Sequence, residues 1–400
     1  MGIFDRLGLK PIINASGAVT RLGGAPMSQA AIDACCQAAA ESVPIEQLQA
    51  VASRQIAELT GTEAGLVTSG AAAALTLGTA AILARHDVGR MERLPDCAAF
   101  PNEFVVAREH RNGYDHAVRA AGARFVEVGF HEIVAGAGVR RVEAPEYEAA
   151  FGPRTAGVLY VFSSGSRPPL EEIVRRAHAH HLPVLVDAAG ELPPRANLKG
   201  IAASGADLVA FSGGKAIRGP QSTGILCGRR EFISSAAVQM LDMDDHQELW
   251  QPPEELIDRA RLSGMPRHGI GRAFKVSKEQ IVALLVAIAA FARGEYDELL
   301  ADYRRFLETI AGLLSGGAAR CHLHESDGEC LPILEIAVDE KKLGRTAMDV
   351  CRSLRAGSPP CYVGHGGLSV GKLIINPMHL NEHNTAELAR RLCEELVPRS

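Results

Sequence analysis

The feature that most constrains the fold of this sequence is an alternation of short apolar runs with helix-length segments between residues 64 and 228. Most of the runs are apolar throughout, which is typical of strands that are buried on both faces of a sheet. This alternation predicts an α/β fold with a mostly parallel seven-stranded sheet and helices on both faces. The seven runs are Ala64–Thr68, Phe104–Ala107, Arg124–Val128, Gly157–Phe162, Val184–Asp187, Leu208–Phe211 and Thr223–Cys227.

The pattern differs on either side of this region. The first 25 residues have little periodicity but enough apolar side chains to predict an arm that is tied into a neighbour and not disordered. From residue 318 onward, strand-like runs alternate with helical segments, which predicts a smaller α+β domain. We therefore expect three parts, namely an N-terminal arm (1–25), a large domain (26–278) and a small C-terminal domain (279–400).

Charge and composition exclude several classes of function. The net charge is −5 and there is no block of basic residues, so neither nucleic acid nor an anionic membrane is expected as a partner. The most apolar run, Ile281–Ala292, is too short to cross a bilayer. The N-terminus lacks the pattern of a signal peptide, so we expect a cytoplasmic protein. No metal site is expected, because Cys321–His324 has no second pair of ligands.

The sixth apolar run leads directly into a glycine turn with a lysine. Ligands of parallel α/β sheets bind beyond the carboxyl ends of the strands, and Lys215 follows such an end after Ser212 and two glycines. Glycine lets the backbone approach a bound group closely, and a desolvated lysine can lose its proton and form a Schiff base with a carbonyl. The alternative is a solvated lysine in a surface turn.

Two further strand ends carry residues that suit the same ligand. Ser69 and Gly70 open an alanine-rich helix whose first amides are suited to bind phosphate, although a packing helix with a serine cap is the alternative. Asp187 ends an otherwise apolar strand and needs a partner, either a protonated pyridine nitrogen or a structural salt bridge or cap. Lys215 follows Asp187 by 215 − 187 = 28 residues, about one strand–helix–strand unit. Together these groups predict pyridoxal 5′-phosphate as the cofactor.

Longer motifs around these residues resemble a known family. The chain is similar to the selenocysteine synthase-like group of fold-type I pyridoxal-phosphate enzymes, and within it to the D-glucosaminate-6-phosphate ammonia-lyase branch. The resemblance covers nearly the whole chain. One position departs from the lyases, since Arg218 occurs where they have an acidic residue. The motifs that carry the resemblance are Ile13–Gly17, Ser69–Ala71, Val186–Ala189, Ser212–Pro220 and Gly269–Glu279.

The resemblance implies a role for each residue around the cofactor. Lys215 would form the Schiff base and Asp187 would pair with the pyridine nitrogen. His110 would stack on the ring, although an exposed loop histidine is the alternative, and Ser163 would contact the ring oxygen or the substrate unless it only forms a turn. The phosphate would be held by Ser69, Gly70, Ala71, Ala72 and Ser212.

An anionic, amino-acid-type substrate would be bound by basic residues. Arg272 is the first choice for a carboxylate, because a guanidinium binds it with two hydrogen bonds. His379 of the small domain would close over the substrate, and the arm and the Arg272 loop would reach the active site of a neighbouring subunit in a homo-oligomer. The further candidates for this role are Arg21, Arg218 and Lys275.

The expected reaction is the α,β-elimination of a β-hydroxyl group, which gives a 2-keto acid and ammonia. Lys215 is the expected base for the Cα proton. Racemisation or epimerisation, aldol cleavage and transamination start from the same chemistry and remain possible reactions. A selenium transferase acting on seryl-tRNA is less favoured, because the family-like segment begins near residue 10 and the chain is acidic. A non-catalytic cofactor-binding protein is the alternative from a different class.

Overall fold

A computed structural model describes residues 2–130, 141–325 and 329–397 of the chain. The chain forms two compact units, Met27–Ala292 and Met1–Pro26 together with Arg293–Ser400. Helix α11 (Lys278–Ala292) packs on α2 (Gln29–Ala39) and α3 (Ile45–Thr60), which places it in the larger unit. The boundary expected at residue 279 therefore lies one helix before the division between the units.

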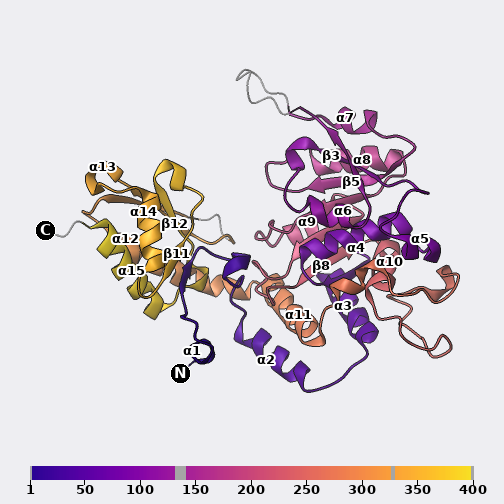
Figure 1. The fold of residues 1–400 in the computed structure, drawn as a ribbon, viewed down its shortest axis with the longest axis horizontal. Helices are drawn as coiled ribbons and strands as arrows, with labels where there is room; N and C mark the ends of the chain where they lie inside the picture. The colour runs from indigo at the N-terminus through magenta and orange to yellow at the C-terminus, as the bar shows by residue number, and fades with distance from the viewer. Residues whose placement is uncertain (1, 131–140, 326–328, 398–400) are drawn as a thin grey trace. The chain divides into compact units, whose positions relative to one another are not determined.

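The larger unit (Figure 1) is built on a seven-stranded sheet, in which the strands have the order β2-β8-β7-β6-β5-β3-β4. Neighbouring strands from β7 to β4 run parallel, whereas β8 is antiparallel to both β2 and β7. The mostly parallel seven-stranded sheet expected from the sequence is thereby confirmed. The strands are β2 (Ala64–Thr68), β3 (Glu103–Ala107), β4 (Arg124–Val128), β5 (Thr155–Val161), β6 (Val184–Asp187), β7 (Leu208–Ser212) and β8 (Gly224–Gly228).

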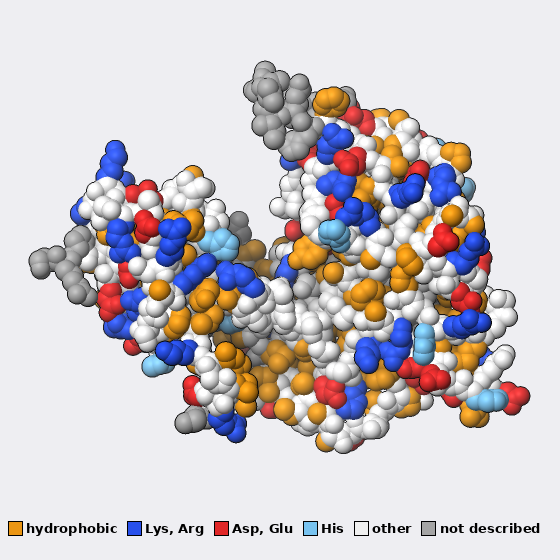
Figure 2. Space-filling model, in the orientation of Figure 1, with side chains coloured by type: hydrophobic (Ala, Val, Ile, Leu, Met, Phe, Trp, Pro, Cys, Tyr) orange, Lys and Arg blue, Asp and Glu red, His pale blue; other side chains and the backbone are white. Residues whose placement is uncertain are grey.

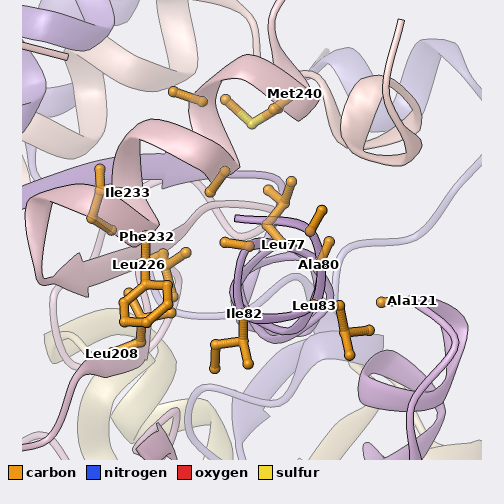
Figure 3. Close-up of a cluster of buried hydrophobic side chains, with 14 of the residues drawn as sticks. Leu77, Ala80, Ile82, Leu83, Ala121, Leu208, Leu226, Phe232, Ile233 and Met240 are labelled. Atoms are coloured by element: carbon orange, nitrogen blue, oxygen red, sulfur yellow. The ribbon is translucent and has the colours of Figure 1, made fainter. Parts of the chain in front are cut away.

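Helices cover both faces of this sheet. Helices α4 (Ala71–Ala84) and α10 (Arg230–Met240) pack together on one face, and their side chains form a core with Leu208 and Leu226 of the sheet (Figure 3). The other face is covered by α3, α8 (Leu170–Ala179) and α9 (Asn197–Ala203). The remaining helices of this unit are α5 (Val88–Arg93), α6 (Asp115–Ala120) and α7 (Ala144–Ala149).

Helix α4 is buried along nearly its whole length. Every residue from Ala73 to Ala84 is buried, as expected for a helix that is apolar on all sides. Its two threonines have hydrogen-bond partners, because Thr79 donates to the Leu75 carbonyl within the helix (2.8 Å) and the Thr76 hydroxyl lies 2.8 Å from the Ala117 carbonyl and 3.1 Å from that of Ala72. The position of the N-terminus of α4 is therefore fixed by packing along the rest of the helix.

The edge strand β2 is closed by side chains of α3. The side-chain amide of Gln49 accepts from the Val67 N–H (3.1 Å) and donates to the Val67 carbonyl (2.9 Å). Ser53 accepts a further bond from the Gly65 N–H (3.1 Å). Both Gln49 and Ser53 are buried, so α3 takes the place of a neighbouring strand along this edge.

The smaller unit contains a three-stranded antiparallel sheet with the order β12-β10-β9. The arm joins this unit, because its strand β1 (Ile13–Ala15) pairs in parallel with β11 (Cys361–Val363). This part of the arm is thus held within the chain itself, and its expected contact with a neighbouring subunit stays a prediction. The sheet strands are β9 (Ala319–His324), β10 (Ile333–Val338) and β12 (Lys372–Ile375), and the long helices are α12 (Leu299–Leu313), α14 (Ala347–Ala356) and α15 (Glu382–Leu396).

Two surface properties bear on possible partners. Within the described ranges, no helix combines the length and the apolar character needed to cross a membrane. Basic and acidic side chains are interspersed on the face shown in Figure 2, in keeping with the small net charge of −5.

Candidate active site

The register of the large sheet places the predicted strand ends close together at the carboxyl ends of its strands, which we call the carboxyl edge. Thr68, Gly224 and Ser212 are aligned partners across β2, β8 and β7. Asp187 of β6 is aligned with Ala210 on one side and with Val161 of β5 on the other. The Ser69 turn, the Ser212 loop and Asp187 therefore follow neighbouring strands at the same edge, where ligands of such sheets bind.

The turn between β2 and α4 forms an open cradle of backbone amides. Gly70 is the N-cap of α4 with φ +93°, and no side chain among the described residues caps this helix. Ser69 therefore does not cap this helix, contrary to the alternative interpretation of the sequence. A Cβ atom on Gly224 would lie 2.3 Å from the Gly70 carbonyl carbon, so only glycine lets β8 pass this turn. Ser69, Gly70 and Ala71 are half-buried and Ala72 is exposed, which leaves the first amides of α4 accessible to an anion.

Asp187 is a buried carboxylate at the end of β6. Its residue is 7% exposed, and its Oδ1 accepts the N–H of Ala189 at 3.1 Å. Burial raises the pKa of Asp187, while the Ala189 N–H and the charge of Lys215 act in the opposite direction. A cation bound beside Asp187 would restore its ordinary ionisation, because an opposite charge favours the charged form.

The loop after β7 folds back on itself and carries Lys215. The Gly213 N–H donates to the Thr223 carbonyl (2.9 Å) and the Gly219 N–H donates to the Gly213 carbonyl (2.9 Å). Arg218 has φ +61°, a left-handed conformation that is uncommon for a residue with a side chain. Lys215 is half-buried, and a Cβ atom on Gly190 would lie 3.8 Å from its Nζ. Lys215 thus reaches the loop that follows Asp187.

Glu191 lies in this same group, although no sequence motif singled it out. Burial raises the pKa of its carboxyl, the charge of Lys215 lowers it, and the charge of Asp187 raises it further. The backbone of Glu191 is fixed, because its N–H donates to the Ala188 carbonyl (3.1 Å) and its carbonyl accepts from Asn197 (2.7 Å). The signal in the sequence is an acidic residue four positions after Asp187 in the loop beyond β6.

His110 is buried beside the carboxyl end of β5. The residue is only 6% exposed, so an exposed loop histidine is not what the structure shows. Its Nδ1 accepts from the Val161 N–H (3.4 Å), and its ring meets that of Tyr160 edge-on with centroids 4.7 Å apart. Its Nε2 is buried without a hydrogen-bond partner among the described residues. Burial, assisted by the charge of Arg141, lowers the pKa of His110 to about 4.

Ser163 lies in an exposed turn after β5. Its hydroxyl is 2.9 Å from that of Ser166, and the Ser166 N–H donates to its carbonyl (3.0 Å). This geometry is that of a simple turn, which the sequence left open for Ser163. Ser212 ends β7 and is half-buried at the carboxyl edge.

The basic residues proposed for the substrate fall into two groups. Arg272 is in the larger unit and forms an ion pair with Asp242, which also accepts from His268 Nε2 at 3.1 Å. The hydrogen bond from the Asp244 N–H, together with those from His268 and Arg272, lowers the pKa of Asp242 to about 2. Arg218 is half-buried in the Lys215 loop, and Lys275 is exposed after the short helix that carries Arg272.

The remaining two candidates belong to the smaller unit. The Arg21 guanidinium lies 5.7 Å from the centroid of the Tyr362 ring, and Arg21 is exposed. His379 Nε2–H donates to the Gly24 carbonyl at 2.8 Å, which ties the arm to the turn after β12. Both residues are thus held by contacts within their own unit.

The residues of the larger unit fit pyridoxal 5′-phosphate. The uncapped helix α4 offers amides for a phosphate, and Asp187 offers a buried carboxylate for a protonated ring nitrogen. Lys215 lies within reach of the same loop, and the unpartnered Nε2 of buried His110 leaves a donor for a bound group. Each part of the cofactor therefore has a chemical counterpart at this edge.

Comparison with known proteins gives consistent findings. Residues 133–244 match the sequence family described as Aminotransferase class-V. A 5′-C-glycyluridine monooxygenase-decarboxylase from a Streptomyces species is 32% identical over 98% of this chain and 92% of its own length. A D-glucosaminate-6-phosphate ammonia lyase from Salmonella typhimurium is 30% identical over 98% of this chain and 97% of its own. A solved structure of a D-glucosaminate-6-phosphate ammonia-lyase has a TM-score of 0.80 and 28% identity, over 98% of both chains.

Proposed function

Since this chain belongs to the selenocysteine synthase-like, class-V aminotransferase family of pyridoxal-phosphate enzymes, we propose that it is a lyase. The proposed reaction removes a β-hydroxyl group from an amino acid or amino sugar acid and yields a 2-keto acid and ammonia. The observation that carries this proposal is the likeness to D-glucosaminate-6-phosphate ammonia lyase along 98% of the chain. The acid–base groups gathered around Lys215 support it.

The residues at the carboxyl edge would divide the work of holding the cofactor. Lys215 would bind it covalently, Asp187 would keep a proton on the ring nitrogen and His110 would cover the ring. When bound, pyridoxal 5′-phosphate withdraws electrons from the substrate carbon that bears the amine. The phosphate would be held by Ser69, Gly70, Ala71, Ala72 and Ser212.

Two basic groups would then act on the substrate. Arg272 would exchange its bond with Asp242 for the substrate carboxylate, which a guanidinium binds with two parallel hydrogen bonds. Lys215 Nζ would take the proton from Cα, because its position beside Asp187 and Glu191 places an amine at the reacting end of the site. Arg218, Lys275, Arg21 and His379 are further candidates for substrate contacts.

A second candidate is an oxidative decarboxylation. The relative from Streptomyces, named a monooxygenase-decarboxylase, is 32% identical over a similar share of the chain. The two reactions differ in what they consume and release. An elimination needs no oxygen and releases ammonia, whereas a monooxygenase-decarboxylase consumes oxygen and releases carbon dioxide.

One experiment separates lyase and decarboxylase activity from each other and from racemase, aldolase and aminotransferase activity. The holoenzyme is incubated with a panel of β-hydroxy amino acids and amino sugar acids, and keto acid, ammonia, oxygen and carbon dioxide are measured together. Equal amounts of keto acid and ammonia without oxygen uptake support the lyase. Oxygen uptake with carbon dioxide supports the decarboxylase. Exchange of the Cα hydrogen alone indicates a racemase, an aldehyde product indicates an aldolase, and an amine passed to an added keto acid indicates an aminotransferase.

We also propose that the enzyme is a cytoplasmic homo-oligomer with shared active sites, as fold-type I enzymes are typically homodimers. Exposed apolar side chains along the arm, including Ile3, Phe4, Leu7 and Leu9, support an arm that packs against a second subunit. Light scattering after size exclusion tests this assembly. A mass of one chain, 42.5 kDa, would contradict it.

A further inference from the structure

Glu191 lies beside the proposed base and has no role in the elimination as proposed above. The loop beyond β6 holds it firmly, through the Ala188 carbonyl on one side and Asn197 on the other. The preceding residue, Gly190, lies against Lys215 Nζ, since a Cβ atom there would be 3.8 Å away. Glu191 is half-buried, and its carboxyl experiences the charges of both Lys215 and Asp187. Three ionisable groups therefore share the end of β6 and the loop after β7.

The proposed elimination needs an acid as well as a base. A β-hydroxyl group leaves poorly as hydroxide and needs a proton as the bond between Cβ and oxygen breaks. Lys215 serves as the base at Cα, so a different group has to supply this proton. We propose that the Glu191 carboxyl donates the proton to the leaving β-oxygen. This inference rests on the proposed lyase function and adds a catalytic residue to it.

The step balances in atoms and electrons. Lys215 Nζ takes the proton from Cα, and the electron pair of that C–H bond forms the Cα–Cβ double bond. The bond between Cβ and oxygen breaks, and the oxygen leaves with its electron pair and the Glu191 proton as water. Lys215 is left as an ammonium and Glu191 as a carboxylate, and transfer of one proton between these neighbours restores both groups. No oxidant or reductant is consumed.

The surrounding groups suit Glu191 to this role. Burial and the charge of Asp187 keep its carboxyl protonated at higher pH than a solvated glutamate, while Lys215 offers the partner that returns the proton. Asp187 is committed to the ring nitrogen. His110 has a pKa of about 4, so at neutral pH it carries a single ring proton and no charge. Glu191 is therefore the better acid for the leaving group.

The decisive test varies the leaving group. The holoenzyme and Glu191→Gln are compared on a β-hydroxy amino acid that the enzyme accepts and on its β-chloro analogue, whose chloride leaves without a proton. Glutamine keeps the size and polarity of the side chain but cannot donate this proton. We expect Glu191→Gln to slow the hydroxy substrate by about 10²-fold or more and the chloro analogue by less than about 3-fold, in line with the usual contribution of a general acid. Equal slowing of both substrates would overturn the proposal.

Control variants separate catalysis from structure. Glu103→Gln changes a half-buried glutamate at the opposite end of the same sheet and should leave both rates unchanged. Glu191→Asp keeps a carboxyl and should recover part of the rate with the hydroxy substrate. Borohydride should still fix the cofactor to Lys215 in Glu191→Gln, which shows that the site is assembled. Loss of this fixation together with loss of both activities would indicate a structural role and count against the proposal.

A measurement on the cofactor-free protein distinguishes failure of this inference from failure of the lyase assignment. With ¹³C-labelled glutamate carboxyl groups, one resonance should titrate above the usual glutamate range near about 4.3 and be missing in Glu191→Gln. If the wild-type enzyme forms no keto acid from any substrate but this resonance is present, the lyase function fails and the acid beside Lys215 stands. If the resonance is absent, Glu191 is not such an acid, whatever the reaction.

Discussion

The two ends of the large sheet each hold one buried aspartate, and the two are treated differently. Asp207 precedes β7, is 1% exposed, and accepts from His178 Nε2 (2.8 Å), the Val184 N–H (2.8 Å) and Arg229 Nη1 (3.1 Å). Asp187 ends β6, is 7% exposed, and accepts the Ala189 N–H at 3.1 Å, with Lys215 acting on it through its charge. One carboxylate is fully bonded, and the other is sparsely bonded.

This contrast offers a criterion by which a buried carboxylate with a functional role can be distinguished from one with a structural role. A buried carboxylate with cations and amides around it stabilises the fold, because removal of one member leaves the others unpaired. A buried carboxylate with few partners costs stability and is explained by a ligand that supplies the missing charge. This criterion supports the proposal that the active site lies at the carboxyl edge and that Asp207 has a structural role at the opposite edge.

The largest expected effect is at Lys215. Lys215→Ala should lower activity by at least about 10³-fold, because the proposed covalent anchor of the cofactor and the proposed base are both removed. Borohydride reduction followed by peptide mass spectrometry measures the anchor directly. Lys199→Ala, which changes an exposed lysine of α9, serves as the control and should keep full activity. Covalent fixation of the cofactor in Lys215→Ala would show that the anchor is elsewhere.

Exchanging each aspartate for asparagine tests the comparison itself. Asp187→Asn should lower activity by about 10²-fold or more while leaving the cofactor-free protein as stable as before, since a poorly compensated charge is removed. Asp207→Asn should cost about 2–4 kcal/mol of unfolding free energy, because His178 and Arg229 lose their partner. Urea denaturation and steady-state kinetics measure the two effects. The reverse assignment of stability and activity would break the comparison.

The protonation of His110, at the carboxyl edge, should make the free energy of unfolding depend on pH. Its folded pKa of about 4 lies below the unfolded value of 6.5, so the unfolded chain binds the proton more tightly. The stability due to neutral His110 is fully present above pH 6.5 and is lost as the pH falls toward 4. Between about pH 7 and pH 5 the wild type should lose about 2 kcal/mol that His110→Phe does not lose. Urea denaturation of the cofactor-free proteins at both pH values measures this difference, and parallel profiles would contradict it.

The smallest effect concerns the phosphate cradle. Gly224→Ala places a methyl group against the Gly70 carbonyl carbon and should weaken cofactor binding by about 10-fold, or about 1.4 kcal/mol. Gly200→Ala in α9 adds a methyl group that has no atom of another described element within 4 Å, and it should instead stabilise the protein by about 0.5–1 kcal/mol. Titration of cofactor-free protein with pyridoxal 5′-phosphate measures the first effect. An unchanged affinity of Gly224→Ala for the cofactor would indicate that the phosphate does not bind at the N-terminus of α4.

The sheet and its strand ends could be predicted because each strand is short, apolar and separated by helix-length segments. Ala64–Thr68, Arg124–Val128 and Val184–Asp187 have the same bounds in the structure as in the sequence pattern. Asp187 and Lys215 could be identified because each is a charged residue at or just after the end of an apolar strand. Local patterns carry no information on which distant elements pack together, so the place of the arm beside β11 and of α11 in the larger unit could not be predicted. Glu191 was missed because it lies in an irregular loop.

The Gln49 amide has a consequence for how this protein associates with itself. An exposed strand edge is a template on which another chain can add a strand and so begin an aggregate. At β2, that template is already occupied by a side chain of the same molecule. The other edge strand of the sheet, β4, has the exposed residues Arg124 and Glu127. Arg108 and Arg111 form ion pairs with Glu127. In the homo-oligomer proposed above, we therefore expect subunits to join through helices and loops and not by strand addition at β2 or β4.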